Sequence, residues 1–230
     1  MTVPPVYRLA DLEPVGMATA SAGLQQRKSA DTRVAILAAA VECLASHGYA
    51  RTTTERVIRQ AGVSRGAMLH HYATKQALIE SVIDYAFYRH MEKFTAAVRE
   101  LPEIERTRDN VGILIDWKLY LSREYSAYLE LMVAARTDAG LAASFQPKAR
   151  RHDAVWRNEL LQVFPEWADK PDRLAKSRRL VQAVMSGMVL NRDTWADPQV
   201  EQALLAFLAA TLLDVREGRR DWAGTPPVPR

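Results

Sequence analysis

The stretch GVSRGAMLHHY, from Gly62 to Tyr72, brings two glycines, a serine, an arginine and two adjacent histidines into eleven residues. Such groups suit two kinds of chemistry. Arginine and histidine can donate hydrogen bonds to the base edges and phosphates of DNA, and histidines can also bind a metal ion. The helices that hold this stretch decide between the two.

A metal site is the weaker interpretation of the histidines. His70 and His71 are adjacent, so on a helix their side chains diverge by about 100° and do not chelate one ion as a pair four residues apart can. The other histidines, His47, His90 and His152, have no partner nearby at a metal-binding spacing. We therefore expect neither a metal site nor a cofactor.

Two short helices are expected before this stretch. Apolar residues recur at helical spacing over residues 33–47, and Gly48 follows where a helix terminator belongs. Thr52 and Glu55 have the spacing of a capping box at the start of a second helix. That helix is expected to end at Gly62, which can adopt the left-handed conformation common at helix ends.

A third helix begins after Ser64, whose hydroxyl can cap it, and extends only to about His71. The second and third helices form the pattern of a helix-turn-helix, in which the start of the later helix enters the major groove of DNA. Gly66 removes a side chain where this helix would approach the groove. The side chains expected to touch base edges or phosphates are Arg65, Ala67 and His70.

The distribution of charge also favours DNA. Between Arg27 and Lys75 there are eight basic and three acidic side chains, a net charge of +5, in a chain whose total is only +4. A polyanion would therefore meet this part of the chain, although a solvated basic surface would look the same.

Residues from Ser29 to about Ala86 resemble the DNA-binding domain of the TetR family of bacterial transcriptional regulators. The matching elements are Gly48-Tyr49, Thr52-Thr53, Ala61-Gly62-Val63-Ser64, His71-Tyr72 and Lys75. The resemblance implies that Thr53, Arg65, Ala67, His71 and Lys75 contact DNA. Adding the basic residues before the first helix and the rest of the third, the expected DNA-binding set is Arg27, Lys28, Thr53, Ser64, Arg65, Gly66, Ala67, His70, His71 and Lys75.

Two positions in this set, His71 and Ala67, and the neighbouring Leu69 differ from the simplest interpretation. For His71, packing on the helix-turn-helix core is an alternative of equal weight to a phosphate contact. Leu69 stands where the family often has a tyrosine that touches a phosphate, and Ala67 stands where it often has threonine. The polar contacts to DNA are therefore expected to be fewer on that side of the helix.

Composition sets the limits on the whole chain. Of its 230 residues 48% are apolar and 25% charged, which is ordinary for a globular protein, and no apolar run is long enough to span a membrane. No secretory signal is recognisable at the start, so we expect a cytoplasmic protein without membrane contact. The single cysteine, Cys43, excludes an internal disulfide and a cysteine-based zinc site.

The remaining two thirds reads as successive helices without a β pattern, which predicts an all-α fold of about nine helices. The expected organisation is a mobile tail (1–28), a three-helix helix-turn-helix domain (29–76), a larger helical domain (77–218) and a C-terminal tail (219–230). By the family resemblance, the larger domain binds a small effector and dimerises through its last two helices. The aromatic and methionine side chains expected to line an effector pocket, for which core packing is the alternative, are Trp117, Tyr120, Tyr128, Met132, Trp156 and Met185.

The last helix supports the expectation of a homodimer. It is apolar almost all round from Ala203 to Leu213, so that one of its faces needs another partner. The residues expected at the dimer interface, on this helix and the one before it, are Val181, Met185, Met188, Leu205, Leu208 and Leu212.

Taken together, these features predict a sequence-specific DNA-binding regulator rather than an enzyme, for which no catalytic motif is recognisable. The most specific hypothesis is a homodimeric repressor, released from a palindromic double-stranded operator by a small, largely apolar effector. The alternative is a DNA-binding protein of the same fold that is controlled by a protein partner or acts architecturally, without such an effector.

Overall fold

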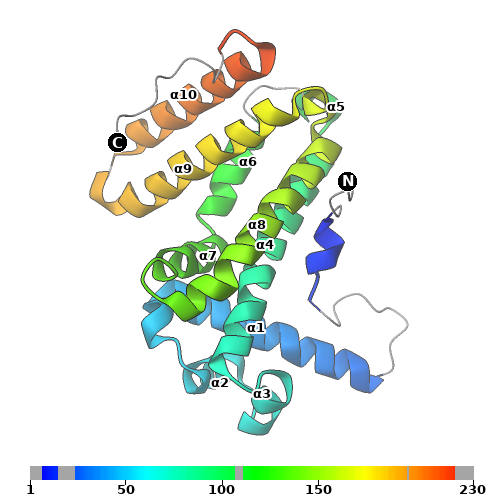
Figure 1. Ribbon diagram of the computed structural model, residues 1–230, viewed down its shortest axis with the longest axis vertical. Helices are drawn as coiled ribbons and strands as arrows, with labels where there is room; N and C mark the ends of the chain where they lie inside the picture. Colours follow the sequence, from blue (N-terminus) through cyan, green and yellow to red (C-terminus); the bar gives the residue numbers. More distant parts are fainter. Residues whose placement is uncertain (1–6, 15–23, 107–110, 196, 221–230) are drawn as a thin grey trace. The chain divides into compact units, whose positions relative to one another are not determined.

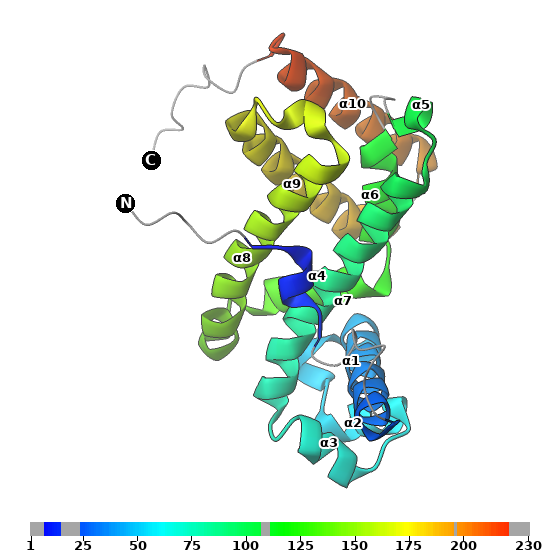
Figure 2. The same cartoon turned by 90° about the vertical axis from the view of Figure 1, so that its right-hand side faces the viewer.

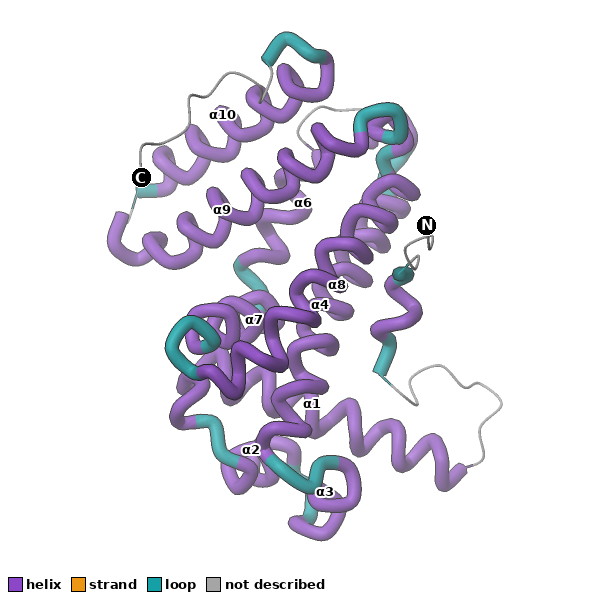
Figure 3. Tube along the Cα trace, in the orientation of Figure 1, coloured by secondary structure: helices purple, strands orange, loops and turns teal. Residues whose placement is uncertain are grey.

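The computed structural model describes residues 7–14, 24–106, 111–195 and 197–220. All regular elements in these ranges are helices, and none is a β-strand (Figure 3), which confirms the expected all-α class. The α-helices are α1 (Leu24–Arg51), α2 (Thr54–Ala61), α3 (Arg65–His71), α4 (Lys75–Glu100), α5 (Glu103–Arg106), α6 (Val111–Tyr120), α7 (Arg123–Ala134), α8 (Ala139–Val163), α9 (Pro171–Trp195) and α10 (Pro198–Glu217). Two 3-10 helices, η1 (Leu9–Leu12) and η2 (Pro165–Trp167), complete the list. The helix beyond the expected nine is α5, a single turn too short to give a periodic pattern.

The chain divides into two compact units, one of residues 1–93 with 122–158 and the other of residues 94–121 with 159–230. The divisions fall within α4 and α8, and not at the expected boundary after residue 76. A boundary inside a helix leaves no linker composition in the sequence to mark it. We describe each unit by itself.

The first unit contains the head, which we define as α1 to α3 (Figure 1). In Figure 2, where α1 is seen nearly end-on, α2 and α3 lie beside it. The backbone of α1 leaves the helical conformation at Gly48, whose φ of 76° favours glycine. Gly62 ends α2 with φ 65°, and its left-handed conformation confirms the expected helix end.

The start of α2 differs from the expected capping box. The N-cap is Thr53, whose hydroxyl accepts a hydrogen bond from the amide of Arg56 at 3.2 Å. Thr52 is buried instead, and its hydroxyl donates to the carbonyl of Gly48 at 2.8 Å. Adjacent threonines offer two equivalent caps in a sequence, and the buried bond to Gly48 decides between them.

The expected N-terminal tail is partly ordered. Helix α1 begins at Leu24 and not near Ser29, and η1 buries Leu12 against the first unit. Two side chains of α8 hold this segment: the amide of Asn158 donates to the carbonyl of Tyr7 at 2.7 Å, and Arg151 donates to that of Asp11 at 2.9 Å. A single 3-10 turn leaves no periodic pattern, so the sequence did not reveal it. The other positions of the expected tails, 1–6, 15–23 and 221–230, lie outside the described residues.

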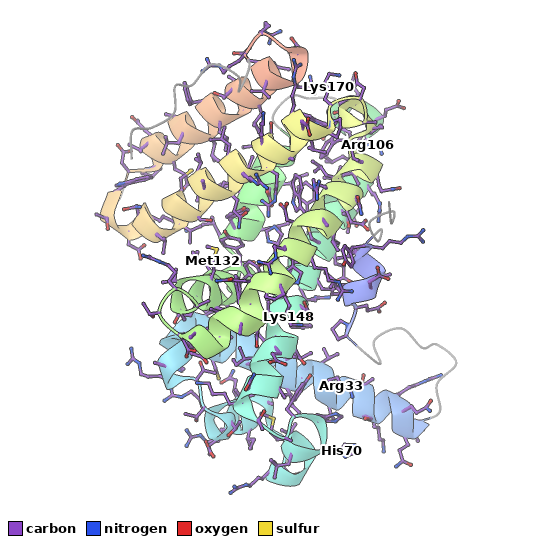
Figure 4. All side chains as sticks on the ribbon, viewed as in Figure 1. Arg33, His70, Arg106, Met132, Lys148 and Lys170 are labelled. Atoms are coloured by element: carbon purple, nitrogen blue, oxygen red, sulfur yellow. The ribbon has the colours of Figure 1, made fainter. Side chains whose placement is uncertain are left out.

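A partly buried polar cluster joins α4, α7 and α8 within the first unit: Tyr128 and His152 are buried, and Asp84 and Lys148 are half-buried. Figure 4 marks Lys148 on α8. The Nε2 atom of His152 lies 2.7 Å from Asp84 Oδ1, and its Nδ1 atom lies 3.2 Å from the hydroxyl of Tyr128. A carboxylate only accepts hydrogen bonds, so Nε2 donates to Asp84, and in the neutral ring Nδ1 accepts from Tyr128. Lys148 pairs with the second oxygen of Asp84.

Burial and hydrogen bonding together set the protonation of His152 and Asp84. His152 is 1% exposed, and burial lowers its pKa below the ordinary value more than the hydrogen bond to Asp84 raises it. Burial raises the pKa of the Asp84 carboxyl, but the hydrogen bonds from His152 and Lys148 outweigh that effect and hold the pKa low. The cluster therefore contains a neutral imidazole and a carboxylate at neutral pH.

The second unit is built by α5, α6, α9 and α10 with the ends of α4 and α8. Polar bonds tie α6 to the last two helices: the indole of Trp117 donates to Glu201 at 2.8 Å, and Arg178 donates to the hydroxyl of Tyr120 at 3.0 Å. Apolar side chains of α9 and α10 fill the space between them. These contacts build the core of the unit.

Candidate nucleic-acid interface

The third helix of the head has one buried anchor and an exposed outer face. Met68 is only 1% exposed and fixes α3 against α1 and α2. The hydroxyl of Ser64 accepts a hydrogen bond from the amide of Ala67 at 3.1 Å, which confirms that Ser64 caps this helix. With one side so held, the opposite side presents Arg65, Gly66, Leu69 and His70 to solvent; Figure 4 marks His70.

The surface at Gly66 is open. A Cβ atom built there would meet a single neighbouring atom, the Ser64 hydroxyl at 3.8 Å, and Gly66 is not among the residues with positive φ. The fold therefore does not require glycine at this position, where alanine would favour a helix. The reason that remains for glycine here is the close approach of a second macromolecule to α3.

Lys75, the first residue of α4, binds to the head. Its ammonium donates to the carbonyl of Tyr49 at 3.0 Å and lies 4.4 Å from the centre of the Tyr49 ring. Burial lowers its pKa, although the Asp138 carboxylate opposes that shift. This side chain fastens the start of α4 to the Gly48–Tyr49 turn, and its expected phosphate contact would have to use the remaining donors.

Glu130, on α7, completes the support of that turn. Its carboxylate accepts a hydrogen bond from the amide of Tyr49 at 2.6 Å, and a Cβ atom at Gly48 would approach the same oxygen to 3.0 Å. No local pattern in the sequence points to Glu130, because the turn that it supports lies 81 positions away. Its effect is to position the head relative to α7.

The other expected DNA-binding residues lie at different places on the head. Thr53 is exposed at the start of α2, and Arg27 and Lys28 are exposed in the first turns of α1. His71 is half-buried and lines a cavity of about 360 Å³ with Arg33 and Leu37 of α1, which agrees with the packing alternative. Burial, and secondarily Arg33, lowers the pKa of His71, so this ring is neutral at neutral pH.

The six expected effector residues are divided between the two units. Tyr128, Met132 and Trp156 belong to the first unit, whereas Trp117, Tyr120 and Met185 belong to the second. Five of them are buried, and Met132 on α7 is half-buried (Figure 4). None of them lines the cavity beside α3 and α4 in the first unit. The same holds for two cavities of the second unit, one of about 760 Å³ beside α5 and η2 and one of about 400 Å³ at the end of α9 and the start of α10.

The residues expected at a dimer interface pack inside the second unit. Leu208 is 2% exposed and Met185 is fully buried. Val181, Met188 and Leu205 are also buried, and Leu212 is half-buried. The large apolar side chains that the last two helices expose are instead Leu190, Trp195, Val200 and Phe207.

The last helix thus has two apolar stripes, and the sequence-based choice took the inner one. Val200, Leu204 and Phe207 are spaced four and three residues apart and share the outer side, where Phe207 is 67% exposed. Leu205 and Leu208 lie on the side that faces the unit's own core. An apolar pattern on every side of a helix does not show which stripe the protomer keeps.

Two further observations concern other kinds of site. Across the described residues, no three or more His, Cys, Asp or Glu side chains are grouped so as to hold a metal ion. Within the same ranges, no helix has the length and apolar character needed to cross a bilayer.

Known proteins are similar to this chain both in the head and in the helices that follow it. The model of the family described as bacterial regulatory proteins, tetR family, matches residues 36–82. The HTH-type transcriptional repressor AcnR of Corynebacterium efficiens is 32% identical over 143 residues, which cover 62% of this chain and 69% of that protein. Rv2912c of Mycobacterium tuberculosis, an uncharacterised HTH-type transcriptional regulator, is 28% identical over 193 residues, or 82% of this chain and 96% of its own.

Solved structures agree with these relatives. A putative TetR-family transcriptional regulator from Rhodococcus sp. has the same fold with a TM-score of 0.61 at 17% identity, covering 81% of this chain and 98% of that one. The capped, outward-facing third helix and these matches define a transcriptional regulator of the helix-turn-helix class. The chain belongs to the TetR family of bacterial regulatory proteins.

Proposed function

We propose that this regulator is a homodimeric repressor that binds a palindromic double-stranded operator and is released from it by a small, largely apolar effector. The observation that carries the proposal is the outer face of α3. There Arg65, Leu69 and His70 are exposed around the open position at Gly66, on a helix fixed by the Ser64 cap and Met68. Such a helix suits the major groove, which admits one α-helix.

The charge of the head supports this assignment. The net charge of +5 between Arg27 and Lys75 attracts the phosphate backbone, which supplies most of the affinity, while the face of α3 supplies the choice of sequence. Arg65 is the strongest candidate for a base contact, because a guanidinium can bond both acceptors of a guanine. Repression follows sterically, since the bound protein occupies DNA that the polymerase needs; the relative AcnR is also named as a repressor.

Selection from a pool of random duplexes tests DNA recognition. We expect enrichment of an inverted repeat and an affinity that falls steeply with salt. On the selected duplex, Arg65→Ala should weaken binding by about tenfold or more and relax the preference at one base pair of each half-site. The matched control is Arg150→Ala, which removes an equally exposed arginine from α8 and should leave both quantities unchanged. Failure to enrich any sequence would remove the proposal.

For the second copy, we propose that it covers the outer stripe of α10 and the exposed apolar side chains next to it. Leu190, Trp195, Val200 and Phe207 come from the ends and the middle of two adjacent helices, and a two-fold axis would set the same patch against itself. Phe207→Asp should give a folded monomer with strongly reduced operator affinity. Ile104→Asp, at an equally exposed apolar residue of α5, should stay dimeric in sedimentation. A dimeric Phe207→Asp protein would place the interface elsewhere.

The effector is proposed to bind at the half-buried side chain of Met132 on α7. The half-buried Met132 is the one predicted pocket residue within reach of a ligand that does not first open the core. Met132→Trp should therefore leave operator binding intact and reduce release by an effector found through a screen of small apolar compounds. If no compound releases the complex and a protein partner does, the alternative mode of control is correct.

A further inference from the structure

An apolar side chain stands on the outer face of α3. Leu69 is 52% exposed, whereas Met68 beside it is buried, so the fold keeps one apolar side chain of this helix and leaves the other in water. The family often has at this position a tyrosine that touches a phosphate, and a leucine cannot make that polar contact. An exposed leucine is unremarkable on most surfaces, but here it lies beside Arg65, Gly66 and His70.

The major groove of DNA offers little to a leucine. Base edges there present hydrogen-bond donors and acceptors, and the one apolar group among them is the 5-methyl group of thymine. A leucine placed against any other edge would remove water from polar groups without replacing their hydrogen bonds, which is unfavourable. Against thymine, the same side chain buries two apolar surfaces together.

We propose that Leu69 reads the 5-methyl group of thymine, so that each operator half-site carries a T·A pair where Leu69 meets the groove. This inference rests on the proposed DNA-binding function and specifies one base of its target. Ala67, on the other flank of the outward face, is also apolar, which leaves Arg65 and His70 as the side chains of this helix that form hydrogen bonds with bases. Recognition by this head therefore combines polar contacts with at least one methyl contact.

The experiment changes the methyl group and leaves the base pairing intact. In the duplex selected from the random pool, each thymine of the half-site is replaced in turn by deoxyuridine, which has the same hydrogen-bonding groups and lacks the methyl. At one position per half-site we expect the wild-type affinity to fall about fourfold, the value of one buried methyl group, and about sixteenfold when both half-sites are changed. A duplex in which 5-methylcytosine·G replaces that T·A pair should bind the wild-type protein more tightly than a duplex with C·G at the same position.

The matched variant is Leu69→Ala, measured on the same duplexes. It should bind the thymine duplex more weakly than the wild type by a similar factor and should not distinguish thymine from deoxyuridine. Because Leu69 is exposed, its removal should leave the unfolding midpoint unchanged. Comparing the two proteins on the two duplexes separates the loss of a contact with Leu69 from any effect of uracil on the shape of DNA.

The outcomes distinguish the inference from the function beneath it. An enriched operator whose deoxyuridine forms bind the wild type equally well overturns the role of Leu69 and leaves the DNA-binding proposal standing. Equal losses in the wild type and in Leu69→Ala would also overturn it, since the methyl group would then act through another residue or through DNA shape. Failure to enrich any operator overturns both.

Discussion

The outer face of α3 and the partly buried cluster around His152 both gather groups that could do chemistry, but only the cluster satisfies them within the chain. Both ring nitrogens of His152 have partners, and Asp84 binds His152 and Lys148. On α3, by contrast, Arg65 and His70 stand in solvent around the open site at Gly66. A polar group with internal partners holds a fold together, whereas an exposed one on a fixed helix is available to a second molecule.

Breaking the cluster should have the largest effect on stability. Asp84→Ala leaves the Nε2–H group of His152 without its acceptor and Lys148 without its counter-ion. We expect the free energy of unfolding to fall by about 2 kcal/mol or more, measured by urea unfolding. Operator affinity should be nearly unchanged at temperatures where the variant is folded. A variant that is stable but no longer binds DNA would assign the cluster a role in recognition.

The N-terminal segment offers the next largest effect. Leu12 is buried by η1, so Leu12→Ala should cost about 2 kcal/mol if the segment belongs to the folded unit. Replacing Leu24, which is exposed in the first turn of α1, by alanine provides the control and should cost little. Equal stability of both variants and the wild type in urea would show that residues 7–14 contribute nothing to the fold.

Acid should weaken the cluster around His152. Burial lowers the pKa of His152, so the unfolded chain takes up a proton below its ordinary pKa of about 6.5 that the folded chain does not. Stability is then fully present above that pH and declines as the pH falls below it, by at most about 1.4 kcal/mol per pH unit.

His152→Gln tests this pH dependence, because the glutamine amide can still donate to Asp84 and does not titrate. Between pH 7.5 and 5.5 the variant should lose less stability than the wild type; the part that remains includes His71, whose pKa burial also lowers. The lowered pKa of Asp84 acts in a separate window, below about pH 4. Identical pH profiles in wild type and variant would contradict the account of the cluster.

Local chemistry made the head predictable from sequence. Gly62 and Ser64 act through their own backbone and the next turn, and Thr74 likewise accepts a hydrogen bond from the amide of Ala77. Bonds between distant segments were not predictable. Glu130 accepts a hydrogen bond from the amide of Tyr49, and Lys75 donates one to the carbonyl of Tyr49. Lys75 therefore has a structural role besides the DNA contact that the family resemblance implies.

For the helices after the head, the all-α fold class was predictable from the sequence, but the packing of individual side chains was not. Helical periodicity identified its helices, yet the dimer residues were chosen from the stripe of α10 that packs inside the unit. An amphipathic helix has one apolar face to assign, whereas α10 has two, and only its packing against α9 tells which is left outside. The same limitation applies to Tyr120 and Met185, which are buried within the second unit: helical spacing alone does not distinguish a side chain that lines a pocket from one that packs in the core.

The claim that the outer face of α3 reads DNA is tested most directly by filling the open site at Gly66. Gly66→Leu places a side chain where the protein itself has room, and a leucine favours a helix more than glycine does, so the unfolding midpoint in urea should be equal or higher. The same side chain would stand between α3 and the groove, and the affinity for the selected duplex should fall by about a hundredfold or more. Ala143→Leu, at an exposed position of α8, should alter neither quantity. A Gly66→Leu protein that folds and binds the operator as tightly as the wild type would contradict the account.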